Sequence, residues 1–507
     1  MQKSPVNSRV VLVFLLLLVT LGCMAQTDTL FWFAAPEVSI STATFDRPIV
    51  VRLTTGAQAA TVTISQPAGG GMPPQVVNVA ANSTQTVDLS AWIDVIENKP
   101  ADVVLAYGLK IQSTTPVTAY YEVVSQQCQC NPEIFVLKGQ NAMGTDFWIP
   151  SQNYLDNNNS YAPVPYSSFD MVATQNNTTI TITPSNSIVG HAAGSAFTIT
   201  LNEGETYSAT AASVLAAQHL QGSRVIADKP IAITIKDDLL NGGPFGGCSD
   251  LGGDQIVPIG LLGTEYVAMK GFLNAPGDQI FVTAIQNGTA ISQDGVAVTT
   301  INAGQTYRLG IAGTATYIQT SAPVYVLQLS GFGCEIGIDI IPPIICTGSF
   351  DVSFTRSTAE DMFINVMVRN GGQNGFLVNG SNAVITGAAF TAVPGTGGQW
   401  LSAQVSLPVG SYPQGTAIRV SNSTALFHLG LIHGGSGSGT RFGYFSNFAR
   451  IDVNAQANAG NVCVGSGIQL TADTIPLATY AWNGPSGFSS AQQNPFVPSA
   501  SANNSGN

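Results

Sequence analysis

The strongest constraint on this chain is a unit that recurs along it, with its clearest copy at residues 222–259. In that copy an extended segment passes through a turn ending at Pro230 into a strand of alternating isoleucines, and then into a glycine-rich loop. Similar segments surround Pro116 and Pro323, and a looser fourth copy at residues 417–427 lacks the proline. Repetition of one supersecondary unit predicts tandem copies of one fold.

A turn signal precedes each of these segments. An Asn-Asn pair begins at Asn176, and an Asn-Gly pair begins at Asn287 in the next copy. Both residue types tolerate the positive φ of a two-residue type I′ turn. We therefore expect the strands on either side of each pair to form a hairpin.

Each copy also begins with an aromatic segment. The residues concerned are Phe31, Trp32, Phe147, Trp148 and Tyr266. Exposed rings would suit a glycan-binding platform. Their recurrence at the start of successive units instead favours a role in the core or at the joint between units, because aromatic rings bury large areas.

Short strands rich in Val, Ile, Thr and Tyr, separated by Gly, Asn and Pro, predict an all-β chain of tandem antiparallel β-sandwich modules. We expect about four related units and a partial immunoglobulin-like domain, in which Cys463 precedes Trp482. The sequence ends before a second cysteine, so we expect this domain to be truncated and Cys463 to be unpaired. The predicted boundaries are a signal peptide at 1–25, units at 26–135, 136–248, 249–335 and 336–450, and the immunoglobulin-like module at 451–507.

The amino terminus has the form of a secretory signal. Lys3 and Arg9 precede an apolar run, and small residues lead to a cleavage site after Ala25. Lipid attachment at Cys23 is the alternative, although the residues before it fit that pattern poorly. No later stretch has the roughly 18 apolar residues of a spanning helix. We expect a protein that is secreted or held at the cell surface, with no stable membrane span.

Charged residues are scarce, at 9% of the chain against about 25% in average globular proteins. The surface must therefore consist largely of Ser, Thr, Asn, Gln and Gly. The formal net charge is −12. Because nucleic acids and anionic lipids attract basic patches, this balance excludes them as expected partners.

The cysteines of an exported chain favour disulfides over metal ligands. The disulfide candidates are Cys128, Cys130, Cys248, Cys334 and Cys346. Three of them, Cys130, Cys248 and Cys334, lie shortly before the aromatic segment of the next unit, so we expect them to mark joints. Cys128 and Cys130 are too close together to bridge each other easily. A local bridge between Cys334 and Cys346 is the first expectation.

Several motifs resemble the bacterial form of the IgGFc-binding protein N-terminal domain family. They are GTDFWIPSQN at Gly144, DMVATQNNTTITI at Asp170, KPIAITIKDD at Lys229, GDQIVPIGLLGTEY at Gly253 and TRFGYFSNF at Thr440. The stretch from Cys463 onward is similar to immunoglobulin-like repeats of large secreted proteins of Bacteroidetes-type bacteria. The resemblance implies an extracellular binding or adhesion protein that takes a host or matrix glycoprotein or a glycan.

Four carboxylates form the densest acidic group in the chain. They are Asp237, Asp238, Asp250 and Asp254. Oxygen ligands on a glycine-rich loop suit Ca²⁺, which makes calcium the one cofactor this sequence suggests. The alternative is that these aspartates bond backbone amides, as aspartate does in turns.

Enzymatic interpretations find little support in the sequence. Asp237 and Asp238 are adjacent and so point to opposite faces of a strand, which does not suit a glycosidase pair. The four histidines have no metalloprotease spacing, and no G-x-S-x-G elbow is present. We therefore expect a non-enzymatic binding protein. A structural stalk and an exported hydrolase with an unrecognised site remain the alternatives.

Overall fold

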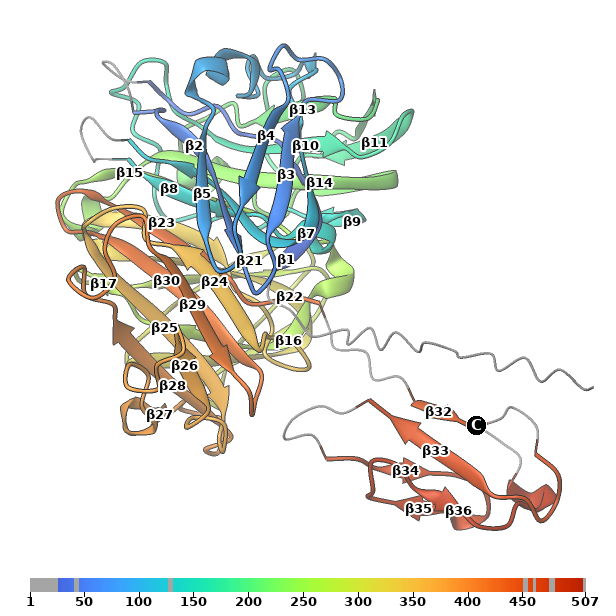
Figure 1. The fold of residues 1–507 in the computed structure, drawn as a ribbon. Coiled ribbons are helices and arrows are strands. Elements are labelled where there is room, and N and C mark those ends of the chain that lie inside the picture. The colour runs from blue at the N-terminus through green and yellow to red at the C-terminus, as the bar shows by residue number, and fades with distance from the viewer. Residues whose placement is uncertain are drawn as a thin grey trace, which may run out of the picture.

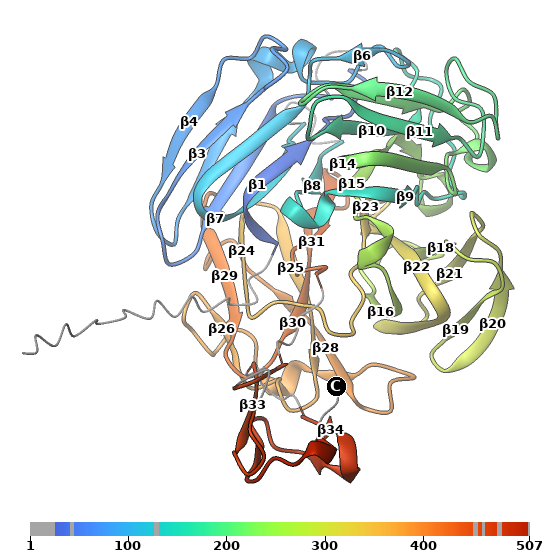
Figure 2. The same ribbon diagram turned by 90° about the vertical axis from the view of Figure 1, so that its right-hand side faces the viewer.

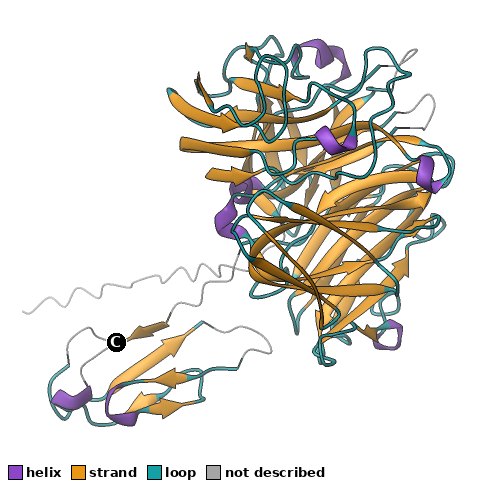
Figure 3. Cartoon of the chain, turned by 180° about the vertical axis from the view of Figure 1, so that it is seen from behind, coloured by secondary structure: helices purple, strands orange, loops and turns teal. Residues whose placement is uncertain are grey.

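The computed structural model describes residues 26–40, 45–125, 131–449, 455–458, 462–473 and 479–504. Antiparallel strands dominate these residues, which confirms the all-β prediction (Figure 1; Figure 3). The predicted signal peptide, Cys128 and Cys130 lie outside the described residues. Among the described residues, no helix has the length and apolarity needed to cross a membrane.

The first repeat is built on one long strand, β7, which pairs with strands on both of its sides. The order of its sheet is β4-β3-β7-β2-β5, and β1 and β8 also pair with β7. Its elements are β1 (Thr27–Phe33), β2 (Ile49–Thr55), β3 (Ala60–Ser65), β4 (Gln75–Val79), β5 (Thr84–Asp88), η1 (Ser90–Val95), β6 (Val104–Leu105), β7 (Leu109–Val123) and β8 (Glu133–Val136).

The second repeat has the same strand order around its own long strand, β14, in the sequence β12-β11-β14-β10-β13. Here β9 and β15 pair with β14, and β6 from the first repeat covers the edge strand β13. Its elements are η2 (Gly139–Ala142), β9 (Gly144–Trp148), β10 (Ser167–Ala173), β11 (Thr178–Thr183), β12 (Phe197–Leu201), β13 (Thr206–Thr210), η3 (Ala216–Gln218), β14 (Arg224–Asn241), η4 (Gly243–Phe245) and β15 (Ser249–Gln255).

The third repeat again has this order, as β20-β19-β22-β18-β21, with β16 and β23 paired to the long strand β22. The same connectivity in three successive stretches of chain is the structural counterpart of the sequence repetition. Its elements are η5 (Ile259–Leu261), β16 (Gly263–Met269), β17 (Phe272–Leu273), β18 (Gln279–Ala284), β19 (Thr289–Gln293), β20 (Val296–Ile301), β21 (Thr306–Gly310), β22 (Ala315–Gly333) and β23 (Glu335–Ile340).

In the fourth repeat the long strand is divided into β29 and β30, so that two sheets form, β24-β29-β26 and β27-β28-β25-β30-β31. The division falls at a turn in which the side-chain oxygen of Asn422 accepts hydrogen bonds from the amides of Thr424 and Ala425. The elements are β24 (Asp351–Thr355), β25 (Asp361–Arg369), β26 (Phe376–Val378), η6 (Gly387–Ala389), β27 (Thr391–Ala392), β28 (Trp400–Ser406), β29 (Ala417–Asn422), β30 (Phe427–Gly435) and β31 (Gly439–Tyr444).

The predicted turn at Pro230 and the predicted hairpin around Asn176 are both wrong, because the long strand β14 runs straight through Pro230. The segment around Pro230 does not turn back, because β14 runs continuously through it and pairs with β11 before the proline and with β10 after it. Accordingly β10 and β11, which flank the turn at Asn176, do not form a hairpin. Asn177 does have the positive φ that was expected, at 53°. The turn at Asn176 instead connects β10, which pairs with β14 after Pro230, to β11, which pairs with β14 before Pro230.

The final strands of the repeats, which we call the closing strands, meet at the centre of the molecule. They are β8, β15, β23 and β31, and each contacts the next, with β31 returning to β8 (Figure 2). Glycines allow this approach. A Cβ on Gly252 would meet Ile338, one on Gly337 would lie 2.7 Å from Phe442, and one on Gly443 would lie 2.7 Å from Val136.

The closed arrangement brings the beginning and the end of the repeat region together. The amide of Gln26 donates to the carbonyl of Phe445 at 3.4 Å, and its side chain donates to the carbonyl of Ser446 at 2.7 Å. Gln26 is 2% exposed. The first and fourth repeats are therefore direct neighbours, although they are far apart in sequence.

The described residues after 454 form short strands and two single-turn helices. They are β32 (Ala455–Ala457), β33 (Ile468–Ala472), β34 (Trp482–Asn483), β35 (Ser489–Ser490) and β36 (Phe496–Val497), with η7 (Pro485–Gly487) and η8 (Ala502–Asn504). Cys463 is an exposed free cysteine, and Trp482 is half-buried. The immunoglobulin-like assignment of this segment stays a prediction.

Candidate functional site

The four predicted calcium ligands lie on two paired strands and not in a loop. Asp237 and Asp238 are on β14, and Asp250 and Asp254 are on β15. All four are at most 5% exposed. The glycine-rich loop is limited to residues 242–248, between β14 and β15, whereas Gly252 lies within β15 and makes room for Ile338 of β23.

Asp254 takes part in a buried ion cluster at the centre of the molecule. The ammonium group of Lys138 lies 2.5 Å from Asp254 and 4.0 Å from Asp339, and all three side chains are 0–1% exposed. Asp254 also accepts a hydrogen bond from the amide of Gln255. Burial, together with the nearby charge of Asp254, raises the pKa of Asp339 well above its usual range. One lysine thus serves two carboxylates from different repeats.

Glu133, on β8, links three closing strands through backbone amides. It accepts hydrogen bonds from Ile134 at 2.9 Å, from Ile338 at 3.0 Å and from Phe442 at 3.0 Å. Burial raises the pKa of this carboxyl well above its usual range despite the three donors. Glu133 therefore joins the first, third and fourth repeats at a point where the strands pack without pairing.

Asp250 joins the second and third repeats in the same way. Its carboxylate accepts a hydrogen bond from the amide of Ile336 at 3.0 Å. Burial, and then the adjacent Glu335, raise the pKa of Asp250 well above its usual range. Two acids held this close in a buried site favour sharing a proton.

A second ion cluster joins the first and fourth repeats. Arg441 donates to Glu122 at 2.7 Å and lies 3.0 Å from Glu360, and Glu122 also pairs with Arg52. Burial alone would raise the pKa of Glu122, but the two guanidinium groups outweigh it and lower that pKa. Several charged residues of this charge-poor chain thus lie where repeats meet.

Sequence reasoning missed most of these groups. Glu133, Lys138, Glu122 and Arg441 are isolated charges in the sequence, and their partners lie far away along the chain. Asp339 had a signal, because its segment IDIIPP, residues 338–343, aligns with GDQIVP, residues 253–258, which contains Asp254. That match would have placed both aspartates at equivalent points of successive repeats.

The contacts of three of the four aspartates favour the backbone-bonding alternative, and those of Asp237 are with side chains. Asp238 accepts from the amide of Ser39 at 2.7 Å, as Asp250 and Asp254 accept from other amides. Within the part of the chain that the structure describes, the group of potential metal ligands lying within 4.8 Å of one another is Cys248, Cys334 and Glu335. Calcium binding by the aspartates stays a prediction.

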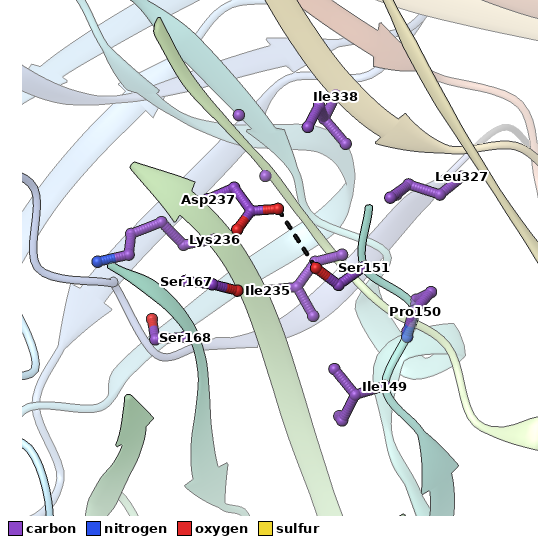
Figure 4. Close-up of a pocket in the computed structure, with 12 residues that line it drawn as sticks. Ile149, Pro150, Ser151, Ser167, Ser168, Ile235, Lys236, Asp237, Leu327 and Ile338 are labelled. Atoms are coloured by element: carbon purple, nitrogen blue, oxygen red, sulfur yellow. Dashed lines mark hydrogen bonds between the residues drawn. The ribbon is translucent and has the colours of Figure 1, made fainter. Parts of the chain in front are cut away.

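Asp237 borders a small buried pocket (Figure 4). Its carboxylate accepts a hydrogen bond from the hydroxyl of Ser151 at 3.3 Å and lies 3.3 Å from the Nδ1 atom of His219. Burial raises the pKa of Asp237. The pocket holds about 10 Å³, which is room for roughly one water molecule, and so it does not suit a ligand.

The cysteines at two joints form a disulfide. Cys248 and Cys334 are bonded, with their Cα atoms 5.3 Å apart. The expected bridge from Cys334 to Cys346 is wrong, because Cys334 sits in the turn between β22 and β23 beside the start of β15, and Cys346 is an exposed free cysteine. The disulfide thus ties the closing strands of the second and third repeats.

The aromatic segments lie at the joints between repeats, which agrees with the prediction of a role in the core or at the joint. Trp32 is 3% exposed and packs with Val172 of the second repeat. Lys110 lies over its ring at 4.8 Å from the centroid. In the next repeat Arg224 lies over Trp148, also at 4.8 Å. The buried indole of Trp32 does not suit a glycan platform.

A groove opens where the fourth repeat meets the first. It has a volume of about 440 Å³ and adjoins a hollow of about 390 Å³ on the sheet β24-β29-β26. Both lie within the size range of small-ligand sites, roughly 300–1,000 Å³. The groove is lined by Thr54, Thr55, Asn82, Ser353, Leu377, Asn379, Gly380, Ala417, Ile418, Arg419 and Ser421.

Two solved structures show distant likenesses to this chain. Trypsin-activated alpha-2-macroglobulin from Escherichia coli matches at 9% identity over 92% of this chain, with a TM-score of 0.12, and the match spans 44% of that protein. The tetra-tandem repeat in the extending region of a large adhesion protein matches at 10% identity over 79% of this chain and 93% of that one, with a TM-score of 0.10. Scores this low carry no argument about fold.

No curated protein matches this sequence. A family model does match: residues 133–432, which make up more than half of the chain, match the IgGFc binding protein family. The matched range runs from Glu133 at the central acids to β30 of the fourth repeat. The chain therefore belongs to the IgGFc binding protein family, which is a family of extracellular binding proteins.

Proposed function

We propose that this protein is a secreted, non-enzymatic binding protein that presents its repeats to a host or matrix glycoprotein or glycan outside the cell. The observation that carries the proposal is the family match over residues 133–432. A surface with few charges suits contact through hydrogen bonds and strand edges more than long-range electrostatic steering.

The arrangement of buried charge supports this proposal over a hydrolase. Glu133, Asp250 and Asp254 each accept hydrogen bonds from backbone amides inside the fold. A hydrolase would need such groups beside a cleft that admits substrate. Here they fasten strands together, and they leave the loops and the groove as the surfaces for recognition.

The alternative of a stalk is less well supported. A stalk stacks its repeats so that each contacts only its neighbours in sequence. In this protein β31 of the fourth repeat contacts β8 of the first, and Arg441 pairs with Glu122. A closed arrangement of this kind favours a rigid platform over a long spacer.

An array experiment tests the proposal. The chain from Gln26 onward would be applied to immobilised extracellular glycoproteins, including immunoglobulin G and its Fc fragment, to the same proteins after enzymatic removal of glycans, and to free glycans. We expect saturable binding to at least one glycoprotein. Binding that survives glycan removal identifies a protein ligand, and loss of binding identifies a glycan. Absence of binding across the array would favour the stalk.

A further inference from the structure

The first two joints between repeats share one construction. At the first joint, Trp32 on β1 pairs across the sheet with Lys110 on β7, whose ammonium group lies over the indole. The turn between β12 and β13 of the second repeat faces this pair, because Lys110 bonds Glu203 at 2.9 Å and Gly108 donates to the carbonyl of Gly204.

The second joint repeats these parts. Trp148 on β9 pairs with Arg224 on β14, and the guanidinium group lies over the ring. The corresponding turn of the third repeat contains Gly304, where a Cβ would lie 3.0 Å from the Trp148 ring. Gly204 and Gly304 have φ values of 80° and 79°. A tryptophan, a cation over it and a turn with positive φ thus fill both joints.

The third joint is filled differently. Val267 on β16 pairs with Tyr317 on β22. Val267 occupies the position of the tryptophan in the first two joints, and Tyr317 occupies the position of the cation. Both belong to a buried cluster that includes Met367 and Trp400 of the fourth repeat. Apolar side chains from both repeats therefore close this joint.

The fourth joint has the cation and the turn with positive φ but lacks the tryptophan ring. Ser353 on β24 pairs with Arg419 on β29, so a serine stands where Trp32 and Trp148 stand. The opposing turn of the first repeat has Asn82 with a φ of 51°. Thr54, on β2, lines the same wall. The groove of about 440 Å³ lies between these parts.

Contacts beside the groove hold its walls in place. Thr355 bonds the hydroxyl of Thr54 at 3.1 Å, and Tyr120 donates to the carbonyl of Thr355 at 3.2 Å. The Arg419 side chain is 44% exposed and is paired with Asp351, whereas that of Lys110 is 21% exposed at the first joint. Because the carboxylate bonds the edge of the guanidinium group, the planar face of Arg419 stays available for stacking.

We propose that the groove at the fourth joint binds an aromatic side chain, tryptophan or tyrosine, carried by a protein partner, with Arg419 stacked on the ring. The inference rests on the proposed binding function and names the site and the partner chemistry for it. Guanidinium groups are attracted to aromatic faces, and the chain already uses this pairing at Trp148. The exposed side-chain amide of Asn82 lines the groove and can bond polar atoms of the partner.

The first experiment uses N-acetyltryptophanamide as the probe, with saturation-transfer NMR on the full chain. We expect transfer from the protein to the indole protons, and none to N-acetylalaninamide. Ser353→Trp restores the tryptophan found at the other joints and should abolish the transfer. Thr198→Trp, on the exposed face of β12, is the matched control and should leave it unchanged.

A second variant keeps the inference testable if Ser353→Trp disturbs folding. Arg419→Ala removes the stacking partner and should weaken probe binding roughly two- to five-fold. Equal transfer in the wild type and both groove variants, or no transfer in the wild type, would overturn the proposal. Transfer to a methyl glycoside of N-acetylglucosamine but not to the indole would assign the groove to glycans and would also overturn it.

The glycoprotein array separates the two proposals. If the wild type binds no glycoprotein, the binding function fails, whatever the NMR result. If the wild type and Ser353→Trp bind the same glycoprotein equally well, the binding function stands and the groove is not its site. Loss of binding in Ser353→Trp, with Thr198→Trp unaffected, supports both.

Discussion

Lys138 carries the positive charge of the ion cluster at the centre of the molecule. Its ammonium group is fully buried between Asp254 and Asp339, and it also donates to the carbonyl of Val136 at 3.2 Å. Two carboxylates in a medium of low polarity repel each other unless a cation lies between them. The lysine is therefore what allows two repeats to bring acids to one point.

Replacing Lys138 with methionine should reduce the free energy of unfolding by about 3–5 kcal/mol, because the buried aspartates lose their partner. Urea unfolding at neutral pH measures the change. Arg419→Met is the matched control, since the side chains of Arg419 and its partner Asp351 are 44% and 30% exposed, and pairs this accessible to solvent contribute roughly 0–1 kcal/mol. Equal effects of the two substitutions would contradict this role for Lys138.

Asp170 should make stability depend on pH. Burial raises the pKa of its carboxyl to about 7, from an ordinary value of about 4 for aspartate. Between about pH 4 and pH 7 the folded state therefore holds a proton that the unfolded state has lost. Relative to Asp170→Asn, the free energy of unfolding of the wild type should fall as pH rises from about 4 to about 7, on the order of 1 kcal/mol per pH unit. Above about pH 7 the difference between the two proteins should stay constant.

The comparison with Asp170→Asn is needed because other buried groups make stability change with pH in the opposite direction. Burial lowers the pKa of His428 and of His433 to about 3. Both histidines remain neutral in the folded state while the unfolded state becomes protonated, so they remove stability as pH falls below about 6.5. Urea unfolding of both proteins at several pH values isolates the aspartate, and parallel curves would contradict the prediction.

At the scale of elements, the closing strands show how glycine sets packing. A Cβ added to Gly337, in the middle of β23, would lie only 2.7 Å from Phe442 and 3.1 Å from Glu133. Strands in the same sheet lie at a fixed spacing, but these strands belong to different sheets and approach as closely as their side chains permit. The glycines determine that distance.

Gly337→Ala should therefore destabilise the protein by about 1–3 kcal/mol through overpacking. Gly310→Ala, at the end of β21 with open space around its Cβ position, is the control and should change stability little. Thermal unfolding of both variants measures the difference. If both substitutions had equally small effects, close packing of the closing strands would not limit stability.

The sequence predicted the elements better than their partners. Alternation and turn residues correctly indicated an all-β chain, and the recurring aromatics correctly indicated buried joints, as Trp32 shows. The hairpin expected around Asn176 failed because the turn signal specifies a backbone conformation and not which strands pair. The contact from Glu133 to Phe442 spans 309 positions, and no local pattern encodes it.

At the scale of the whole molecule, the bond between Cys248 and Cys334 fastens two repeats at their closing strands. Removing it with Cys248→Ser and Cys334→Ser together should lower the free energy of unfolding by about 2–5 kcal/mol. Urea unfolding measures this. Cys346→Ser is the control, because Cys346 is an exposed free cysteine, and it should leave stability unchanged. A double variant as stable as the wild type would show that central packing alone holds these repeats.

The contact between Gln26 and Phe445 has a mechanical consequence. Because the chain enters and leaves the repeat region at neighbouring points, tension applied at Gln26 and through residues after 449 would load that one junction. The pull would not extend the repeats one after another. Stretching single molecules between these points should give one main rupture, in which the Gln26 junction and the Arg441–Glu122 pair yield together. A bound partner in the groove would sit beside the same seam between the first and fourth repeats.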